Sequence, residues 1–480
     1  MSKAVSLRVA AATALRWSIG ARFATQIIRW GATLLVIRLL TPEDYGLLAM
    51  TMVVISFATL FNELGAAAVI VRRHDLSPNE IGSLQGLVAA LNLGLGLIVF
   101  LLAPYVSALY GSDITTILRA CCLMFLAYSV GIVQEALLIR AMDFKSRALV
   151  ETTAQVTGAV LTLGLALLGF GVWALVFGML ATRTLKALGF LRLVPERYPW
   201  RLSLADVRPH IGYAGTIALQ RMVYWIPGNV TVMLIGILKG PALLGLYNVG
   251  KDLAFLPLNK LGSVLNEVGF ATYARSQEKI DGVRNALEKS LAFVSFAFIP
   301  YALLGAALAP EAVAVVLGER WLPVVPIIQL MIVAVPFRAL NVQLSEALNA
   351  AGDARGGLRI QLGFAILTTT CVAAGAFWSI ETAAAGWAVA MPLVHALALR
   401  EARRSLGLSL KPLWRPYGRS LAVGVAAVLA VLLARSALGP VDPVVAFPLL
   451  GVAGTALAVA TVAILDRERL LDVARFARAR

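Results

Sequence analysis

The chain has 480 residues, of which 60% are hydrophobic and 14% charged, and its mean hydropathy is +0.83. Soluble domains have about a quarter of their residues charged, so this composition excludes a soluble globular protein and indicates a polytopic membrane protein. The net charge of +16 is accompanied by no nucleic-acid-binding motif, so we attribute it to membrane topology rather than to nucleic-acid binding. Contact with anionic lipid headgroups is a second use of the basic residues.

Long apolar runs, each about 20 residues or more, predict fourteen membrane-spanning helices, because that length crosses a hydrocarbon core of ~30 Å. In chain order they lie at 16–40, 45–71, 80–104, 113–138, 148–170, 172–191, 211–238, 243–272, 286–308, 323–349, 357–378, 382–399, 417–437 and 444–465. The first run is too long for the apolar region of a signal peptide and no small-residue cleavage pattern follows it, which indicates an uncleaved first span.

The distribution of basic residues between the connecting segments predicts the orientation. About thirty of the 42 lysines and arginines lie on the side of the N-terminus, including those in the stretches 183–208 and 400–419. The other side has Lys239, Arg320 and Arg435. The positive-inside rule then predicts that both termini are cytoplasmic, which agrees with an even number of spans.

An internal repeat divides the predicted spans into two sets of six. Residues 20–49 recur at 219–248, 199 positions later, and this shift places Arg22 on Arg221 and Pro42 on Pro241. The sequence Glu-Ala-Leu at 135–137 recurs at 346–348, which pairs the fourth span with the tenth. Because six is an even number, both copies enter the membrane from the same side, so the pseudo-two-fold axis is expected along the membrane normal.

The repeat and the positions of the prolines predict the domain boundaries. An N-terminal lobe is expected at 1–192 and a C-terminal lobe at 211–402, joined by a cytoplasmic linker at 193–210 that is rich in proline and arginine. The remaining residues, 403–480, would contribute two helices without a counterpart in the repeat and a cytoplasmic tail.

Charged and amide side chains inside the predicted spans indicate a polar cavity. A charge at the centre of a bilayer costs ~2.5–3.5 kcal/mol on insertion scales, so these groups must face water, protein or ligand. In the first span, Arg22, Gln26 and Arg29 lie on one helical face; in the eighth, Asn248, Asp252 and Asn259 recur at nearly whole turns. The alternative is that such stripes only hydrogen-bond neighbouring helices.

The central cations outnumber the acids, and arginine is suited to two-pronged recognition of phosphate, so an anionic ligand is expected. The candidate substrate-binding residues are Arg22, Gln26, Arg29, Arg221, Asn248, Lys251, Asn259 and Arg338. The driving force stays open: Glu63, Asp252 or Glu267 could carry a coupling ion, or Lys251 and Asp252 could form a simple ion pair. The three cysteines and three histidines are scattered without ligand spacing, and neither a metal site nor a cofactor is expected.

Several motifs, in this order, resemble the polysaccharide transporter family, the Wzx-type flippases of the MOP (multidrug/oligosaccharidyl-lipid/polysaccharide) superfamily. They are LTPEDYGLLAM (40–50), ELGAAAVIVRR (63–73), ALLIRAMDFKSRALVE (136–151), GFGVWALVFG (169–178), YNVGKDLAFLPLNKLGSVL (247–265) and AGDAR (351–355). The resemblance implies a MATE-like, all-α fold of two six-helix bundles that alternate access in the bacterial inner membrane. It also implies export of undecaprenyl-pyrophosphate-linked oligosaccharides to the outer leaflet for surface polysaccharide synthesis, in contact with membrane lipids.

Within the superfamily, the resemblance to lipid II flippases implies a cationic cavity with an arginine in the first helix, a role that Arg22 or Arg29 would fill here. A polysaccharide polymerase and chain-length proteins are further partners that the resemblance suggests. Twelve helices are common among Wzx proteins, so the last two spans are a departure from that pattern.

Three other functions are compatible with a polytopic membrane protein, and each has a feature that this sequence lacks or does not require. A MATE-type multidrug exporter would share the fold, but it would be expected to have an acidic rather than an arginine-rich cavity. A membrane glycosyltransferase or oligosaccharide ligase would need acidic catalytic residues or a large outward loop, and no outward segment here is longer than about 15 residues. A channel would not require two lobes with matching arginines. We therefore expect a transporter and not an enzyme.

Overall fold

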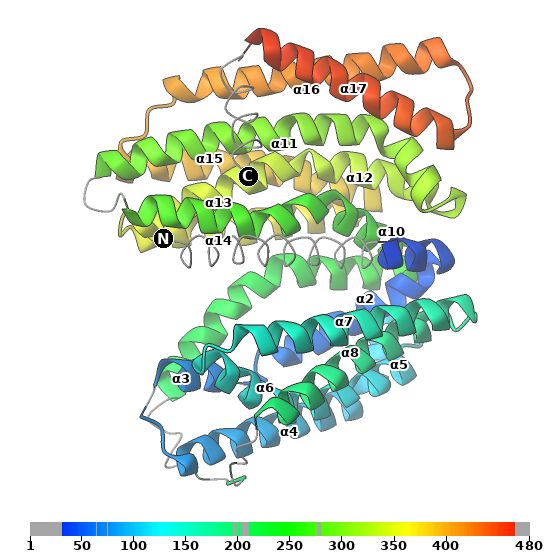
Figure 1. Ribbon diagram of the computed structural model, residues 1–480. Coiled ribbons are helices and arrows are strands. Elements are labelled where there is room, and N and C mark those ends of the chain that lie inside the picture. The colour runs from blue at the N-terminus through cyan, green and yellow to red at the C-terminus, as the bar shows by residue number, and fades with distance from the viewer. Residues whose placement is uncertain are drawn as a thin grey trace, which may run out of the picture. The chain divides into compact units, whose positions relative to one another are not determined.

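The computed structural model describes residues 31–63, 65–73, 75–194, 198, 200, 201, 203, 211–275 and 280–465; the side chains of 211–221, 223, 224, 259–275 and 280 are not described. Within these ranges the regular structure is helical (Figure 1). The helices are α2 (Pro42–Thr59), α3 (Ala66–Arg72), α4 (Pro78–Tyr110), α5 (Thr115–Cys121), α6 (Leu123–Arg140), α7 (Phe144–Leu167), α8 (Val172–Leu193), α10 (Ile211–Arg275), α11 (Ile280–Val316), the 3₁₀ helix η2 (Glu319–Val324), α12 (Val325–Ile332), α13 (Ala334–Ala350), α14 (Ala354–Ala376), α15 (Ile380–Leu406), α16 (Lys411–Leu438) and α17 (Pro443–Leu465).

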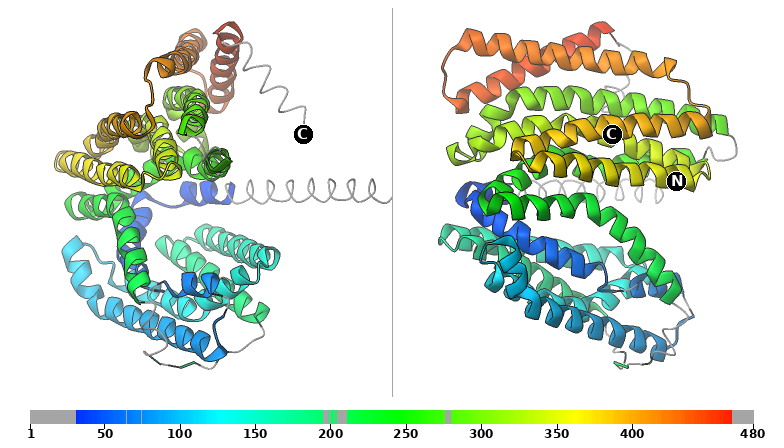
Figure 2. Two further views of the ribbon diagram at one scale, coloured as in Figure 1. Left: turned by 90° about the vertical axis from the view of Figure 1, so that its left-hand side faces the viewer. Right: turned by 180° about the vertical axis from the view of Figure 1, so that it is seen from behind.

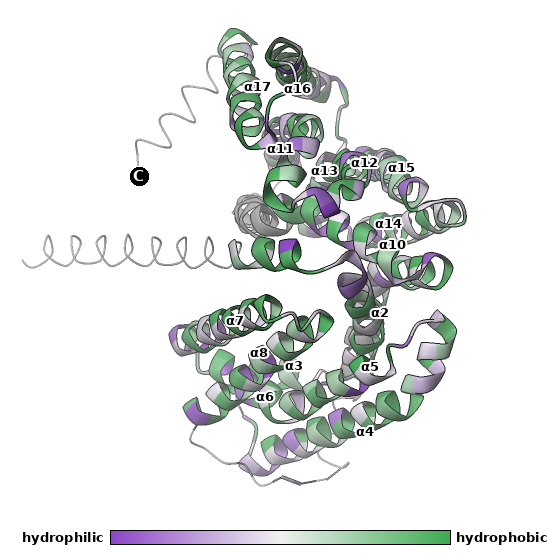
Figure 3. Ribbon diagram, turned by 90° about the vertical axis from the view of Figure 1, so that its right-hand side faces the viewer, coloured by the Kyte–Doolittle hydropathy of each residue, from purple (hydrophilic) through white to green (hydrophobic). Residues whose placement is uncertain are grey.

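Eleven helical segments of the described chain are long and apolar enough to cross a membrane. The two shortest runs of the sequence belong to α8 and α15, which are both longer than predicted. Large apolar side chains are exposed along α4, α16 and α17, and the hydropathy colouring shows these helices as mainly apolar (Figure 3). Such surfaces suit contact with lipid tails, so the prediction of an all-α polytopic membrane protein is confirmed.

The chain divides into two compact units, residues 1–221 and 222–480. The division between the units falls within α10. The sequence instead predicts a linker at 193–210 between lobes at 1–192 and 211–402, and these lobe boundaries stay a prediction. In the first unit, α4 packs on α6, α6 on α8 and α7 on α8. In the second unit, the helices in corresponding chain order pack in the same pairs: α11 on α13, α13 on α15 and α14 on α15.

The turns between helices repeat with the helices. After α6, Met142 adopts a left-handed conformation with φ of 55°, and Asp143 accepts a hydrogen bond from the Ser146 N–H. After α13, Gly352 has φ of 86°, and Asp353 accepts the same bond from the Gly356 N–H. A hydrogen bond from the Ser146 hydroxyl, together with the one from the Ser146 backbone N–H, lowers the pKa of the Asp143 carboxyl.

The matched turns also fix the register of the duplication. Met142 and Gly352 are 210 positions apart, one fewer than the offset between the two Glu-Ala-Leu sequences. The pairing of the fourth span with the tenth is therefore correct, but Glu135 corresponds in the structure to Ser345 rather than to Glu346.

Helix starts follow from local capping chemistry. Thr41 accepts a hydrogen bond from the Asp44 N–H, while the Asp44 carboxylate accepts one from the Thr41 N–H, and Pro42 occupies the first turn of α2. This capping box satisfies two backbone donors that a helix start leaves unpaired. The motif LTPEDYG thus encodes a helix start.

The structure divides the predicted run at 45–71, and it makes the boundary between the runs at 211–238 and 243–272 a kink inside α10. The run at 45–71 is not one helix: α2 ends at Thr59, and α3 begins after Gly65, which has φ of 75°. A left-handed residue cannot continue a right-handed helix, so the chain turns there. The runs at 211–238 and 243–272 both belong to α10, whose regular path is interrupted at Gly240, with φ of 78°. Pro241 follows directly, as Pro42 follows Thr41 at the start of α2.

The last two helices extend the second unit. α16 packs against α11 and α17. α16, in orange, and α17, in red, lie side by side in both views of Figure 2. A small cluster of Leu308, Val431, Ala446 and Leu450 joins them to α11. Arg435 of α16 donates to the Ala307 carbonyl and to the Glu311 carboxylate of α11, with nitrogen–oxygen distances of 2.7 and 2.9 Å.

Candidate functional site

A cavity of about 300 Å³ lies inside the first unit, between the turn that follows α2 and the facing sides of α6 and α8. The α2 end contributes Thr59, Asn62 and Glu63; α6 contributes Ala127, Tyr128, Gly131, Ile132 and Glu135; α8 contributes Arg183, Lys186, Ala187 and Phe190. Four of these twelve side chains are charged, which is unusual for the interior of a membrane protein and marks a candidate binding site.

Small residues that line the cavity allow α6 and α8 to approach each other closely. A Cβ atom placed on Gly131 would lie 3.1 Å from the Cβ of Ala187. The turn that follows α2 is held in place by Asn92 of α4, whose side-chain amide donates a hydrogen bond to the Asn62 backbone carbonyl at 2.7 Å. On the same helix, Gln85 donates to the Ser129 carbonyl of α6 at 2.7 Å. These bonds fix the turn and α6 against one rigid helix.

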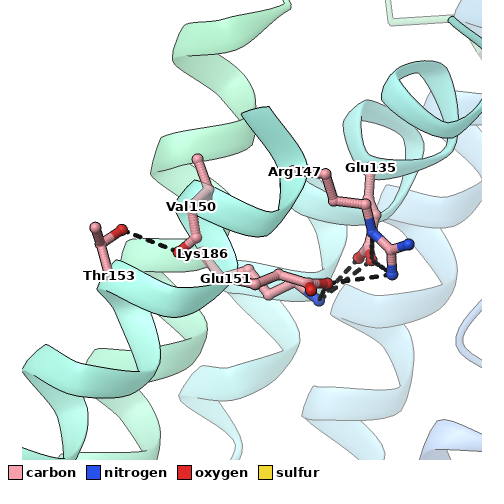
Figure 4. Close-up of polar contacts among 6 residues, drawn as sticks. All are labelled: Glu135, Arg147, Val150, Glu151, Thr153 and Lys186. Carbon is pink, nitrogen blue, oxygen red and sulfur yellow. Dashed lines mark hydrogen bonds and ion pairs between the residues drawn. The ribbon is translucent and has the colours of Figure 1, made fainter. Parts of the chain in front are cut away.

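Two acids and two bases form a closed ion-pair network at one end of the cavity (Figure 4). Glu135 of α6 is 2.9 Å from Arg147 of α7 and 3.1 Å from Lys186 of α8. Glu151 of α7 is 3.2 Å from Arg147 and 3.3 Å from Lys186. All four side chains are half-buried, and the network joins three helices with no net charge. Glu135 and Glu151 therefore pair with the basic residues of α7 and α8.

Arg183 is the cation of this cavity that lies outside the network. Its guanidinium carbon lies 5.5 Å from the centre of the Tyr128 ring, a cation–π contact. Within the part of the chain that the structure describes, no acidic side chain forms an ion pair with it. Arg183 is exposed, so its guanidinium remains available to a ligand.

The site residues expected from the sequence are described to different extents. Arg22, Gln26 and Arg29 lie outside the described residues. Arg221, Asn259 and Glu267 lie on α10, but their side chains are not described. Their proposed roles therefore stay predictions.

Three others have described side chains on α10, in the second unit. Asn248 and Lys251 are half-buried and Asp252 is exposed, all within one turn of the helix. Their neighbour Tyr247 is fully buried, and its hydroxyl accepts a hydrogen bond from the Trp387 indole at 2.9 Å. This bond holds α10 against α15.

Arg338 of α13 also has a defined environment. Its guanidinium carbon lies 4.0 Å from the centre of the Phe364 ring, and Phe364 in turn contacts Trp387. The contact fixes the direction of the side chain.

Glu63, one of the residues considered for ion coupling, lies in the turn between α2 and α3 rather than in a continuous helix, and it lines the cavity of the first unit. The structure thus brings it into the same cavity as Glu135, Arg183 and Lys186. Sequence reasoning missed Arg183 and Lys186 because it counted them with the basic cytoplasmic segment. The signal was their position: both lie inside the apolar run at 172–191.

The fold is that of the MOP superfamily transporters. The lipid II flippase MurJ in an inward-closed conformation is similar with a TM-score of 0.76, covering 95% of this chain and 100% of that one at 12% sequence identity. An inward-facing MATE-family multidrug resistance transporter of that superfamily gives a TM-score of 0.60, covering 79% of this chain and 94% of that one at 13% identity.

The chain belongs to the polysaccharide biosynthesis protein family, whose match covers residues 35–326. It is 25% identical to the lipopolysaccharide biosynthesis protein WzxC of Escherichia coli over 65% of this chain, and 26% identical to the succinoglycan biosynthesis transport protein ExoT of Rhizobium meliloti over 66%. These matches span 64% of the length of WzxC and of ExoT. The expected Wzx-type family is confirmed.

Proposed function

We propose that this protein is a flippase that moves undecaprenyl-pyrophosphate-linked oligosaccharides from the cytoplasmic to the outer leaflet of the bacterial inner membrane, for surface polysaccharide synthesis. The observation that carries the proposal is the family match over residues 35–326, in a chain with a MOP transporter fold. The relative ExoT is named a succinoglycan biosynthesis transport protein, which is consistent with a saccharide substrate.

The proposed mechanism uses charge neutralisation and alternating access. The headgroup enters sideways from the cytoplasmic leaflet, while the prenyl tail stays in lipid. Arg22, Arg29, Arg221 and Arg338 neutralise the pyrophosphate, with Gln26, Asn248, Lys251 and Asn259 as further hydrogen-bonding groups. Rocking of one lobe against the other then opens the site to the outside. A coupling ion on Glu63, Asp252 or Glu267 would supply the driving force.

A direct test is deletion of the gene in its own host, followed by mass spectrometry of lipid-linked sugars. The proposal predicts that a complete lipid-linked repeat unit accumulates, that surface polysaccharide is lost, and that a plasmid copy reverses both effects. A drug exporter would instead leave the lipid-linked pool unchanged and increase drug sensitivity. Normal surface polysaccharide with no accumulated intermediate would contradict the proposal.

A further inference from the structure

The cavity of the first unit has a counterpart in the second unit that is filled. Gly131 and Asn341 each precede the left-handed turn residue, Met142 or Gly352, by eleven positions. Ala187 and His395 each follow the N-cap of their helix by sixteen positions. Where Gly131 and Ala187 meet in the first unit, the buried Asn341 and His395 side chains meet in the second, with Oδ1 and Nδ1 2.8 Å apart.

The same comparison extends to the remaining cavity residues. Ala127 corresponds to Phe337, whose ring lies 5.7 Å from that of His395. Three of the charged residues have uncharged counterparts, because Ser345 replaces Glu135, Val394 replaces Lys186 and Met391 replaces Arg183. Tyr128 has the opposite relation, because its counterpart is Arg338. Two copies of one scaffold therefore differ at this position, since the first holds Glu135, Lys186 and Arg183 where the second has uncharged side chains. Packing alone does not require the charged version.

The depth of Arg183 makes its charge costly. It lies eleven residues after Val172 and ten before Leu193, which places it ~15 Å along the axis from either end of α8. That distance is too great for the side chain to reach an interface easily, and a cation at such depth requires a partner. Lys186 and Arg147 have theirs in Glu135 and Glu151, whereas the described partner of Arg183 is the Tyr128 ring.

From these observations we propose that the cavity between α2, α6 and α8 is a second headgroup subsite that binds an oxyanion on a sugar, with Arg183 as its principal ligand. The inference rests on the proposed function. The oxyanion is a uronate carboxylate or a phosphate. Carboxylate and amide oxygens of Glu135 and Asn62 lie in the same cavity and suit the hydroxyl groups beside that anion. The neutral network at Glu135, Arg147, Glu151 and Lys186 keeps the walls in place without attracting a second anion.

The test uses substitutions taken from the second unit. Arg183→Met copies the counterpart Met391, and Ala187→His copies His395, which fills the cavity without removing the charge. Thr184→Met is the matched control, because Thr184 is an exposed residue of α8 that does not line the cavity. Arg183→Lys keeps the charge but not the planar fork.

Binding is measured on the purified full-length protein in nanodiscs by titration with glucose 6-phosphate, sodium glucuronate and glucose, because inorganic pyrophosphate would also bind the arginines proposed to neutralise the lipid pyrophosphate. Arg183→Met and Ala187→His should each weaken binding of one anion by about tenfold or more, the loss of a charge-assisted hydrogen bond, and Arg183→Lys by less. Thr184→Met should bind as the wild type does, and glucose should show no dependence on Arg183. Preference for glucose 6-phosphate over glucuronate, or the reverse, identifies the source of the oxyanion. Anion binding that is equal in the wild type and in Arg183→Met overturns the subsite.

The same variants are then tested for complementation of the gene deletion. The subsite predicts that Arg183→Met restores export poorly although the protein is inserted and folded, while Thr184→Met restores it fully. If the wild type restores export and Arg183→Met does so equally, the subsite is wrong and the proposed function stands. If the wild-type gene has no effect on the lipid-linked pool, the proposed function itself is wrong.

Discussion

Arg29 is the residue from which the sequence predicts the largest effect on transport. It is expected about halfway across the first span, on one face with Arg22 and Gln26. Arg29→Ala should abolish export of the surface glycan while the protein remains folded and inserted, because the pyrophosphate loses a contact worth ~1.5–3 kcal/mol. Arg29→Lys should rescue in part. Export by the alanine variant at the wild-type level, measured on cells with equal amounts of protein, would assign Arg29 a structural role.

The ion-pair network makes a second prediction, on stability. Glu135→Gln or Glu151→Gln alone leaves Arg147 and Lys186 with one acid, so each should destabilise by about 1 kcal/mol. The double variant leaves two half-buried cations without an acid from the network, and its loss should exceed the sum of the single losses, as expected for coupled neighbours.

The measurement is thermal unfolding of the purified protein in detergent. Asp75→Asn is the control, because the Arg73–Asp75 pair is exposed and such pairs contribute little. Strict additivity of the two network substitutions would show that the four side chains act as independent pairs.

At the residue scale, the sequence identifies charged residues in apolar runs, but it does not predict which charged side chains from different helices lie close together. The sequence identifies Glu63 as a polar residue in a span, yet its position in the cavity that Arg183 also lines depends on the break after α2. The cavity itself depends on Gly131 meeting Ala187, which belong to different helices and carry no signal of their own. A pattern within one helix does not encode such a contact.

At the element scale, the paired turns allow a backbone prediction. Gly352 has φ of 86°, and a Cβ atom there would meet no heavy atom within 4 Å. Gly352→Ala should therefore destabilise the second unit by about 1–2 kcal/mol through left-handed strain alone. The control is Gly164→Ala, since Gly164 lies inside α7 with equally open space and alanine is favoured in helices. Equal melting temperatures for the two variants would argue against strain at this turn.

The helix boundaries show what the sequence predicts well. Thr41-Pro42 and Ser77-Pro78 lie where α2 and α4 begin, because capping chemistry is local. The predicted run at 45–71 misses the break at 60–65, because the residues on both sides of the break are apolar and hydropathy alone does not distinguish one long helix from two short ones. Gly65 was its visible signal. The interruption at Gly240 lies between the predicted runs at 211–238 and 243–272, and its local signal is Pro241, which the repeat matches to Pro42.

At the scale of the whole molecule, the orientation remains to be tested. Cysteines introduced at Ser203 and Ser409 should react with a membrane-impermeant reagent only from the cytoplasmic side, and cysteines at Ser112 and Asp442 only from outside. Ser112 follows α4, Ser409 precedes α16 and Asp442 precedes α17, so these three lie between helices. Labelling of Ser203→Cys in intact cells would reverse the topology and with it the proposed direction of transport.

The central claim is that this chain moves a lipid-linked saccharide across a bilayer, and the most direct test is reconstitution. The lipid-linked intermediate that accumulates in the deletion strain would be labelled with a fluorophore on its sugar and incorporated with the purified protein into liposomes. A membrane-impermeant quencher then reports the fraction in the outer leaflet. The account predicts that quenching proceeds past the outer-leaflet half towards completion with the wild type, but stays near half in empty liposomes and with Arg29→Ala. Quenching that stays at half with the wild-type protein, under an imposed ion gradient of either sign, would contradict it.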